Sequence, residues 1–413
     1  MSTLIVRAAY AFATLGLFAL PCMGQQWTRF RGPNGSGISN ATTVPATWTN
    51  KDYNWRVELP GVGHSSPVLW GDRIFLMSAT NDGRQRMVLC LSAVDGRLLW
   101  SRSYGASTHK KHSFNSFASP TPTVDAQRVY TLWADPTAYV VTALDHDGKE
   151  IWRRDFGPFH GNHGVGTSPI LYEDMLVVGK DEDENSSLFA VDRRTGEDRW
   201  AVRRESARVA YSTPCLLELD GAAPQLIFCS LAYGMSSIDA KTGHRNWDIP
   251  VFDKRTVSSP VVSGNLILGS CGSGGGGNFV VAVKAANPMS AAMPEEIYRV
   301  KKSAPYVPTT LVYNDMAFLW SDGGVVTCIN VADGNVQWRK RIGGKFFGSP
   351  VCVNRRLYCV SEKGDVVVLA AARTFNKLGR VSLGEECRST PAVAGGVMYL
   401  RTVSHLYSLG GGK

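Results

Sequence analysis

Short apolar segments alternate with polar turns along most of the chain, and no segment shows the spacing of an amphipathic helix. One recurring half-unit begins with Ser/Thr-Pro and continues with an apolar strand, a turn and a second strand, as in SSPVLWGDRIFL at residues 65–76. The prolines that mark these half-units are Pro67, Pro122, Pro169, Pro214, Pro260, Pro308, Pro350 and Pro391. The pattern predicts a pair of strands that is repeated eight times.

The other half-unit is an apolar strand followed by Asp-Gly or Thr-Gly, with an aromatic residue four positions after the glycine. CLSAVDGRLLW at residues 90–100 and AVDRRTGEDRW at residues 190–200 are two copies. Glycine supplies the left-handed turn between two strands, and a tryptophan at a fixed offset is expected to pack on the neighbouring unit. We therefore interpret the motif as architectural, with the docking residues Trp55, Trp100, Trp152, Trp200, Trp247 and Trp338.

Four strands in each unit of about 40 to 50 residues predict an all-β, eight-bladed β-propeller with four-stranded antiparallel blades. The eighth unit ends at LYSLGGGK and lacks a final strand, whereas YNWRVELP at residues 53–60 carries Trp55 in a strand-like context. The N-terminal strand is therefore expected to complete the last blade and close the ring, which removes exposed sheet edges. The predicted organisation is a signal peptide at 1–24, an N-terminal extension at 25–52 and the propeller at 53–413.

The first residues have the order of a secretory signal peptide. Arg7 is followed by the uncharged run AAYAFATLGLFAL, then Pro21 and small residues up to Gly24. This order predicts export with cleavage after Gly24, because the apolar run is short for a membrane span; a membrane anchor is the alternative. We expect a periplasmic or other extracytoplasmic location, with no transmembrane span after the signal is removed.

The net charge of the chain is +9, and its basic residues are scattered, without a run of five or more. This distribution argues against a nucleic-acid-binding arm, while attraction to anionic partners stays open. Cys215 and Cys229 flank one predicted hairpin turn, and Cys352 and Cys359 flank another. In an oxidising compartment each pair is either a disulfide or two small core residues, and the sequence leaves both alternatives open.

AVDRRTGEDRW resembles the tryptophan-docking motif of pyrroloquinoline-quinone (PQQ)-like propellers. That superfamily includes the quinoprotein alcohol dehydrogenases and the non-enzymatic outer-membrane assembly factor BamB. WTRFRGPNGSGIS at residues 27–39, HSFNSFASPTPTVDAQRVY at 112–130 and HGVGTSPILYEDML at 163–176 are similar to segments of exported bacterial PQQ-like repeat proteins. The resemblance covers nearly the whole mature chain and implies the propeller fold, but it leaves the chemistry undecided.

The resemblance implies PQQ with a calcium or lanthanide ion at the propeller centre if the chain is an enzyme, held by Glu, Asn and Asp and often beside two adjacent cysteines. This chain has no Cys-Cys pair. The stretches before each Ser/Thr-Pro, which should line the channel mouth, contain four acids, Glu205, Asp253, Glu385 and Glu386. The basic residues there are Lys110, Lys111, Arg204, Arg208, Lys254, Arg255, Lys301, Lys302, Lys345 and Arg388. Because a hard cation needs clustered oxygen ligands, we predict neither a resident cofactor nor a metal, although PQQ is itself an anion.

The mouth stretches also contain histidines, but without the spacing of a metal-binding motif. The ligand-binding candidates at the mouth are His64, His112, Asn115, His163, Arg208, Lys345 and Arg388, and no residue is predicted to be catalytic. The predicted function is that of an exported, monomeric, non-catalytic module that binds or scaffolds a protein partner or an anionic ligand. The alternatives are a PQQ- and metal-dependent oxidoreductase, similar to alcohol or sugar dehydrogenases, and a binder of anionic polysaccharide.

Overall fold

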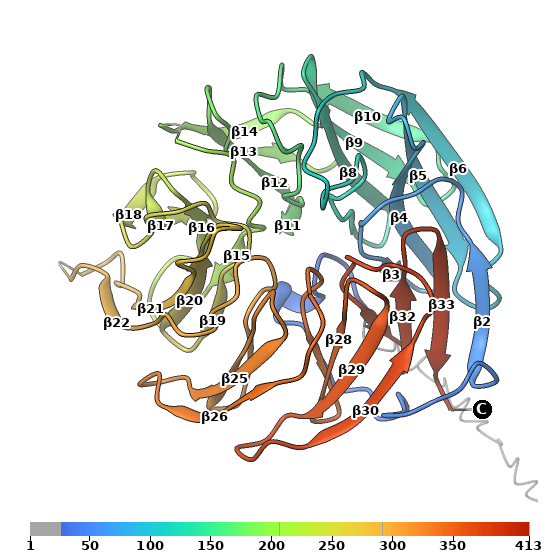
Figure 1. The fold of residues 1–413 in the computed structure, drawn as a ribbon. Coiled ribbons are helices and arrows are strands. Elements are labelled where there is room, and N and C mark those ends of the chain that lie inside the picture. The colour runs from blue at the N-terminus through green and yellow to red at the C-terminus, as the bar shows by residue number, and fades with distance from the viewer. Residues whose placement is uncertain (1–25, 206, 291, 413) are drawn as a thin grey trace, which may run out of the picture.

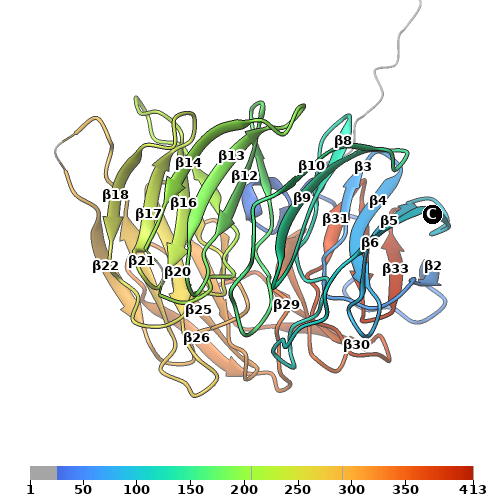
Figure 2. The same ribbon diagram turned by 90° about the horizontal axis from the view of Figure 1, so that it is seen from above.

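The computed structural model describes residues 26–205, 207–290 and 292–412, so the predicted signal peptide lies outside the described residues. These residues form eight sheets arranged in a ring, each built on four antiparallel strands, with the shortest strand of each sheet nearest the centre (Figures 1 and 2). The prediction of an all-β, eight-bladed propeller is confirmed. Within the described ranges, no helix has the length and apolar character needed to cross a membrane.

In blades 1 to 7 the four blade strands run from the centre outward in chain order. Blades 1 and 2 contain β3 (Val68–Trp70), β4 (Arg73–Ala79), β5 (Gln85–Ser92), β6 (Leu98–Gly105), β7 (Thr123–Val124), β8 (Arg128–Asp135), β9 (Ala138–Asp145) and β10 (Glu150–Asp155). Blades 3 and 4 contain β11 (Ile170–Tyr172), β12 (Met175–Lys180), β13 (Ser187–Asp192), β14 (Asp198–Arg203), β15 (Cys215–Leu217), β16 (Gln225–Ser230), β17 (Gly234–Asp239) and β18 (Arg245–Ile249).

The second half of the ring follows the same plan. Blades 5 and 6 contain β19 (Val261–Ser263), β20 (Leu266–Cys271), β21 (Phe279–Lys284), β22 (Glu295–Val300), β23 (Leu311–Tyr313), β24 (Met316–Trp320), β25 (Val325–Asn330) and β26 (Val336–Arg341). Blades 7 and 8 contain β27 (Val351–Val353), β28 (Arg356–Val360), β29 (Asp365–Ala370), β30 (Lys377–Ser382), β31 (Ala392–Ala394), β32 (Val397–Arg401), β33 (His405–Gly410) and β2 (Tyr53–Glu58). Strand β2 pairs antiparallel with β33, so blade 8 combines strands from both ends of the described chain.

Residues 27–39, which we call the N-terminal plug, lie across one end of the ring centre. Its short 3-10 helix η1 (Pro33–Gly35) is the blue element at the centre of Figure 1. The backbone of Trp27 bridges to Leu69 of blade 1, and the side-chain amide of Asn34 bonds both backbone groups of Leu216 in blade 4. Strand β1 (Ile38–Ser39) pairs parallel with β27 of blade 7. The plug therefore ties together blades that are far apart in the sequence.

Two buried arginines fix the N-terminal plug to the innermost strands. Arg29 donates to the carbonyl oxygen of Pro214 at 2.5 Å, and Arg31 donates to that of Pro350 at 3.4 Å. Burial lowers the pKa of Arg29 to about 10 and that of Arg31 to about 9. Both acceptors are prolines of the Ser/Thr-Pro repeat, so the plug bonds to the same repeat position in two different blades.

The tryptophans of the repeat contact the next blade along the chain. The indole N–H of Trp100 donates to the carbonyl of His146 at 2.8 Å, and a Cβ added to Gly148 would lie 2.8 Å from the Trp100 ring. The other indole donors and carbonyl acceptors are Trp55 and Ala93, Trp152 and Arg193, Trp200 and Ala240, and Trp338 and Ala372. In blade 5 the hydroxyl of Tyr298 makes the equivalent bond to Val331. Trp247 is buried, but its indole N–H has no partner among the described residues.

All eight described cysteines are buried free thiols. Cys215 lies opposite Ile227 in its hairpin, and Cys352 lies opposite Leu357, so neither faces the cysteine at the other end of the same hairpin. In this structure the four residues are therefore small core side chains.

Candidate functional site

A closed ring of eight hydrogen bonds surrounds the centre of the propeller. In each blade, the backbone N–H of the Ser or Thr before the innermost strand donates to the side-chain oxygen of the equivalent residue in the next blade. The bonds run from Ser66 through Thr121, Ser168, Thr213, Ser259, Thr309, Ser349 and Thr390 back to Ser66, at 2.9 to 3.1 Å. This hydroxyl ring explains why every unit of the sequence repeat contains Ser or Thr at this position.

The hydroxyl ring corrects one detail of the sequence repeat. In blade 6 the ring residue is Thr309, so Pro308 lies before the ring residue instead of after it. Thr310 occupies the place that proline has in the other blades.

A second ring of residues lies two positions before the members of the hydroxyl ring. Its members in blade order are His64, Ser119, Gly166, Tyr211, Val257, Val307, Phe347 and Arg388. All eight line one cavity. We call these residues the variable ring, because their charge, polarity and size differ from blade to blade. They determine the chemistry of the cavity wall at this level.

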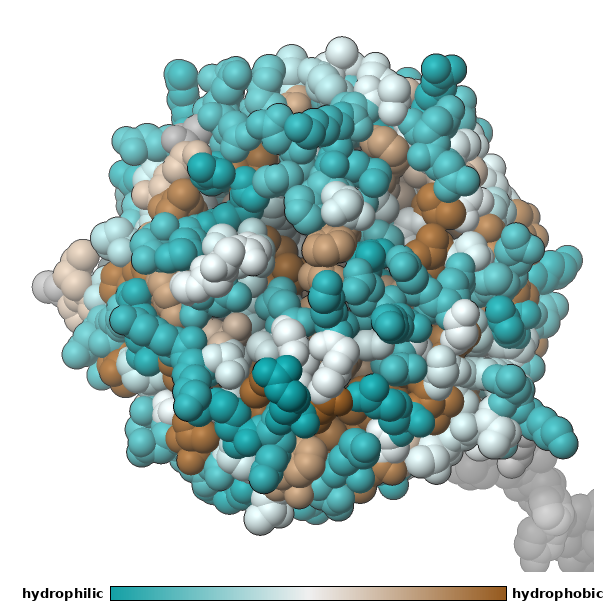
Figure 3. All heavy atoms as spheres, viewed as in Figure 1, coloured by the Kyte–Doolittle hydropathy of each residue, from teal (hydrophilic) through white to brown (hydrophobic). Residues whose placement is uncertain are grey.

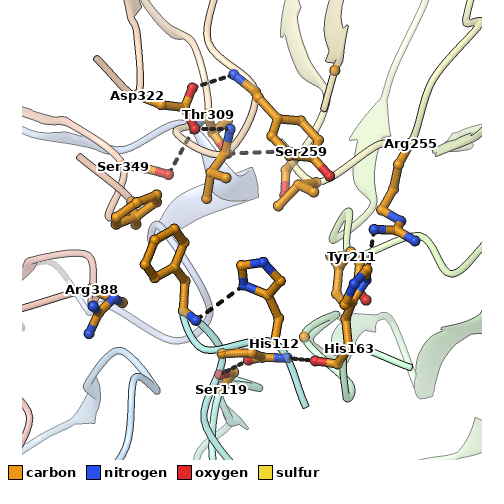
Figure 4. A pocket seen from close by; sticks show the side chains of 18 of the residues that line it. His112, Ser119, His163, Tyr211, Arg255, Ser259, Thr309, Asp322, Ser349 and Arg388 are labelled. Carbon is orange, nitrogen blue, oxygen red and sulfur yellow. Dashed lines mark hydrogen bonds between the residues drawn. The ribbon is translucent and has the colours of Figure 1, made fainter. Parts of the chain in front are cut away.

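The cavity has a volume of about 930 Å³ and is bounded by the two rings, by the loops that join successive blades and by Phe30 of the N-terminal plug. Figure 4 shows side chains from all around the ring converging on it. Its volume is that of a typical small-molecule site. The rest of the face seen in Figure 3 is mainly hydrophilic, with hydrophobic residues in small separate groups.

All seven candidates predicted from the sequence line this cavity. They come from the loops before six different blades, and the fold brings them to one place. The seven are His64, His112, Asn115, His163, Arg208, Lys345 and Arg388. Lining the cavity does not by itself give each of them the same role.

Asn115 is committed to holding two loops together. Its side-chain amide donates to the carbonyls of His163, at 2.7 Å, and Val165, at 3.2 Å, in the loop before blade 3. Its side-chain oxygen accepts from the backbone of Ser116 and from the hydroxyl of Ser119. With its donors and its acceptor in use, Asn115 positions its neighbours and shapes the cavity wall.

The charges that line the cavity are predominantly positive. Arg208, Lys254, Arg255, Lys345 and Arg388 line it, against Asp253 and Asp322. Asp322 accepts from the backbone N–H groups of Tyr306 and Val307, and Asp253 lies 3.3 Å from the amine of Lys254. Glu205, Glu385 and Glu386, which the sequence placed near the mouth, do not line the cavity.

Three of these cations have no described carboxylate within 4.0 Å, namely Arg208, Arg255 and Lys345. Arg388, in contrast, pairs with Glu362 at 2.8 Å and with Glu386 at 3.1 Å. The cavity therefore carries positive charge that the described carboxylates leave unpaired.

Arg388 also belongs to an aromatic cluster at the mouth. The rings of Phe114 and Phe347 have centroids 4.7 Å apart, and the guanidinium carbon of Arg388 lies 5.4 Å and 5.8 Å from them. Such cation–aromatic contacts are favourable, and they hold the loop between blades 1 and 2 against blades 7 and 8. The cluster covers part of the cavity, and Phe114 remains 41 % exposed.

The hydrogen bonds of two histidines fix where their protons lie. His163 Nδ1 lies 2.7 Å from Arg255 Nη1, and His112 Nδ1 accepts from the backbone N–H of Phe114 at 3.1 Å. Since an arginine only donates, Nδ1 of His163 is an acceptor and its proton is on Nε2. The same holds for His112 when it is neutral. A metal-binding imidazole has the opposite pattern, because its second nitrogen donates while the first binds the metal.

The donor set of the cavity does not fit a PQQ site that includes a calcium or lanthanide ion. Such an ion takes at least six oxygen ligands, usually with several carboxylates among them. Of the two carboxylates that line the cavity, Asp322 bonds to backbone N–H groups and Asp253 lies beside Lys254. The described residues contain no group of three His, Cys, Asp or Glu side chains close enough to hold a metal.

The eight blades form a β-propeller of the PQQ-like-repeat class. The family model described as outer membrane protein assembly factor BamB matches residues 48–268, 137–315, 304–378 and 322–409. The chain belongs to this family. No curated protein matches the sequence.

Solved structures share the fold at low sequence identity. BamB from Moraxella catarrhalis has a TM-score of 0.60 at 14 % identity, over 86 % of this chain and 97 % of that chain. Quinohemoprotein alcohol dehydrogenase from Comamonas testosteroni has a TM-score of 0.67 at 12 % identity, over 94 % and 81 %. The computationally designed Ika8 protein has a TM-score of 0.62 at 11 % identity, over 87 % and 99 %. The same fold therefore occurs in BamB, in an alcohol dehydrogenase and in a designed protein, and the fold alone does not select a function.

Sequence reasoning missed several residues of the cavity. Tyr211 was overlooked, although its position two residues before Thr213 is the repeat signal that identifies the variable ring. The sequence places Arg255 near the mouth but does not predict its bond to His163. That bond joins the loops before blades 5 and 3, and neither loop sequence contains a signal for it. Phe30 belongs to the N-terminal plug, which has no counterpart in the repeat.

Proposed function

We propose that this protein is an exported, non-catalytic binding module that holds an anionic ligand in its central cavity. One observation carries the proposal: the cavity gathers cations from several blades, and the carboxylates near them leave Arg208, Arg255 and Lys345 without a close partner. Positive charge focused in a hollow attracts anions and raises their local concentration. Membership of the BamB family is compatible with a binding role.

The cavity also offers few acceptors and many donors. The two histidines whose Nδ1 accepts a hydrogen bond present Nε2–H groups, and the cations and hydroxyls donate as well. A ligand that is rich in acceptor oxygens suits this wall better than a neutral or cationic one. Sulfated and carboxylated saccharides are rich in acceptor oxygens, so this wall is also compatible with the alternative of an anionic-polysaccharide binder.

The test is calorimetric titration of the purified protein with a heparin-derived hexasaccharide and with a neutral maltohexaose. The proposal expects saturable binding of the sulfated hexasaccharide that weakens with salt, and no binding of the neutral one. The double variant Arg208→Glu/Lys345→Glu should bind at least about tenfold more weakly, which corresponds to about 1.4 kcal/mol. Lys377→Glu is the matched control, because Lys377 is exposed on the outermost strand β30 and does not line the cavity.

A second titration, with PQQ and calcium chloride, tests the oxidoreductase alternative. The reason to test it is the fold that the chain shares with quinohemoprotein alcohol dehydrogenase. The measurements are PQQ absorbance and dye-linked oxidation of ethanol and glucose. Turnover would refute the non-catalytic proposal. Equal affinity for the sulfated and the neutral hexasaccharide, or no binding of either, would refute the anionic ligand.

A further inference from the structure

One side of the cavity gathers hydrogen-bond donors from three successive loops. His163 lies before blade 3, Tyr211 before blade 4 and Arg255 before blade 5, and Figure 4 shows the three side chains together. Arg255 Nη1 lies 2.7 Å from His163 Nδ1, and the guanidinium carbon of Arg255 lies 6.0 Å from the centre of the Tyr211 ring. We call these three residues the donor cluster.

The donor cluster has one internal bond, and that bond uses the acceptor nitrogen of His163. Burial, and then the positive charge of Arg255, lowers the pKa of His163, which favours the neutral imidazole. With Nδ1 accepting from Arg255, the proton of His163 lies on Nε2. The histidine therefore supplies a donor and no further acceptor.

Two other donors of the cluster lack partners. The hydroxyl of Tyr211 and Nε of Arg255 are both buried, and neither has a hydrogen-bond partner among the described residues. Arg255 also has no described carboxylate within 4.0 Å. Buried polar groups in proteins are almost always hydrogen-bonded, and leaving one without a partner costs free energy. A site with these properties calls for an anionic acceptor from outside the chain.

We propose that the donor cluster is an oxyanion subsite, where a sulfate, phosphate or carboxylate group of the ligand accepts from Arg255, Tyr211 and His163. The inference rests on the proposed function and specifies which part of the cavity recognises the charge. One such group is much smaller than the cavity of about 930 Å³, so it belongs to a larger molecule whose remainder contacts the other walls. Guanidinium groups match these oxyanions because their planar N–H groups bond two oxygens at once.

The decisive variant is Tyr211→Phe, which removes one hydroxyl and changes nothing else. That hydroxyl has no partner in the described structure, so the variant should fold at least as stably as the unmodified protein. If the oxyanion accepts from it, the variant should bind the heparin-derived hexasaccharide about tenfold more weakly, the effect of losing one bond to a charged group. Tyr313→Phe is the matched control, since Tyr313 ends β23 and does not line the cavity.

A second readout follows the imidazole of His163 by nuclear magnetic resonance. In the protein without added anions, Arg255→Gln should raise the pKa of His163, because it removes a neighbouring positive charge. Sodium sulfate, sodium phosphate and sodium acetate are then added separately to the unmodified protein. A bound anion should also raise this pKa, and the salt that does so at the lowest concentration identifies the class of oxyanion.

The outcomes separate the two proposals. Equal hexasaccharide affinity of Tyr211→Phe and Tyr313→Phe, with binding intact, would overturn the subsite and leave the binding function standing. The subsite would also fail if none of the three salts changed the His163 titration. Absence of hexasaccharide binding to the unmodified protein contradicts the proposed function itself.

Discussion

Replacing Gly196 with alanine measures how much the contact between blades 2 and 3 contributes to stability. Gly196 has a φ of +77°, and an added Cβ would lie 2.9 Å from two ring carbons of Trp152. The left-handed backbone costs an alanine about 1–2 kcal/mol. Displacing the packed Trp152 ring adds about 1–3 kcal/mol, the usual cost of overpacking. The expected loss is therefore about 2–5 kcal/mol.

Gly264→Ala is the matched control, because Gly264 has a φ of +58° and no atom lies within 4 Å of an added Cβ. It should lose only the backbone contribution of about 1–2 kcal/mol. Urea unfolding gives both values from the midpoints, provided that the slopes agree. Equal destabilisation by the two substitutions would refute the idea that Trp152 packs tightly on the next blade.

A double-mutant cycle with Trp152→Phe isolates the clash from the backbone strain. Because phenylalanine is smaller than tryptophan, the added methyl group of Gly196→Ala has more room in this background. The extra cost of Gly196→Ala should shrink by about 1 kcal/mol or more, a coupling expected only of residues in contact. Additive effects would indicate that the two residues do not press on one another.

Three further predictions concern the hydroxyl ring, His64 and the buried cysteines. Thr213→Val leaves the buried N–H of Ser168 without its acceptor and should cost about 1–3 kcal/mol in urea unfolding, whereas Thr213→Ser keeps the oxygen and should cost less. Burial, and then the charge of Arg388, lowers the pKa of His64 to about 3 in the folded protein, against about 6.5 for histidine in an unfolded chain. Between these two pH values the unfolded chain therefore binds one more proton than the folded protein. Stability should therefore fall as the pH drops from 6.5 towards 3, and the fall should be smaller in His64→Gln. The eight described cysteines should react with a thiol reagent only in denaturant, because all are buried and none is bridged.

The propeller could be predicted because its signals are repeated. A turn glycine or a Ser/Thr-Pro pair is weak by itself, but seven Ser/Thr-Pro pairs and an eighth proline at similar spacing are hard to explain otherwise. The N-terminal plug could not be predicted in this way, since it occurs once. Its anchors are bonds such as that from Arg29 to the carbonyl of Pro214, and a backbone carbonyl carries no sequence signal.

The candidate site was predictable to the extent that position in the repeat determines position in the ring. The repeat placed His64 and Arg388 at the mouth, and the same logic identifies Tyr211 once the hydroxyl ring is known. What the repeat does not determine is how side chains from different blades pair. The bond between His163 and Arg255 depends on two loops of unlike length and sequence, so only the folded chain shows it.

The two rings obey different constraints, and this difference explains how one fold serves unlike functions. Each member of the hydroxyl ring accepts a hydrogen bond from one neighbour and donates its N–H to the other, so losing an oxygen breaks a contact between blades. Among the described residues, no hydrogen bond joins the side chains of neighbouring members of the variable ring. Their identities can therefore change without opening the propeller. In the proposed function, positions that the architecture leaves free recognise the ligand, and Tyr211 of the variable ring is one of them.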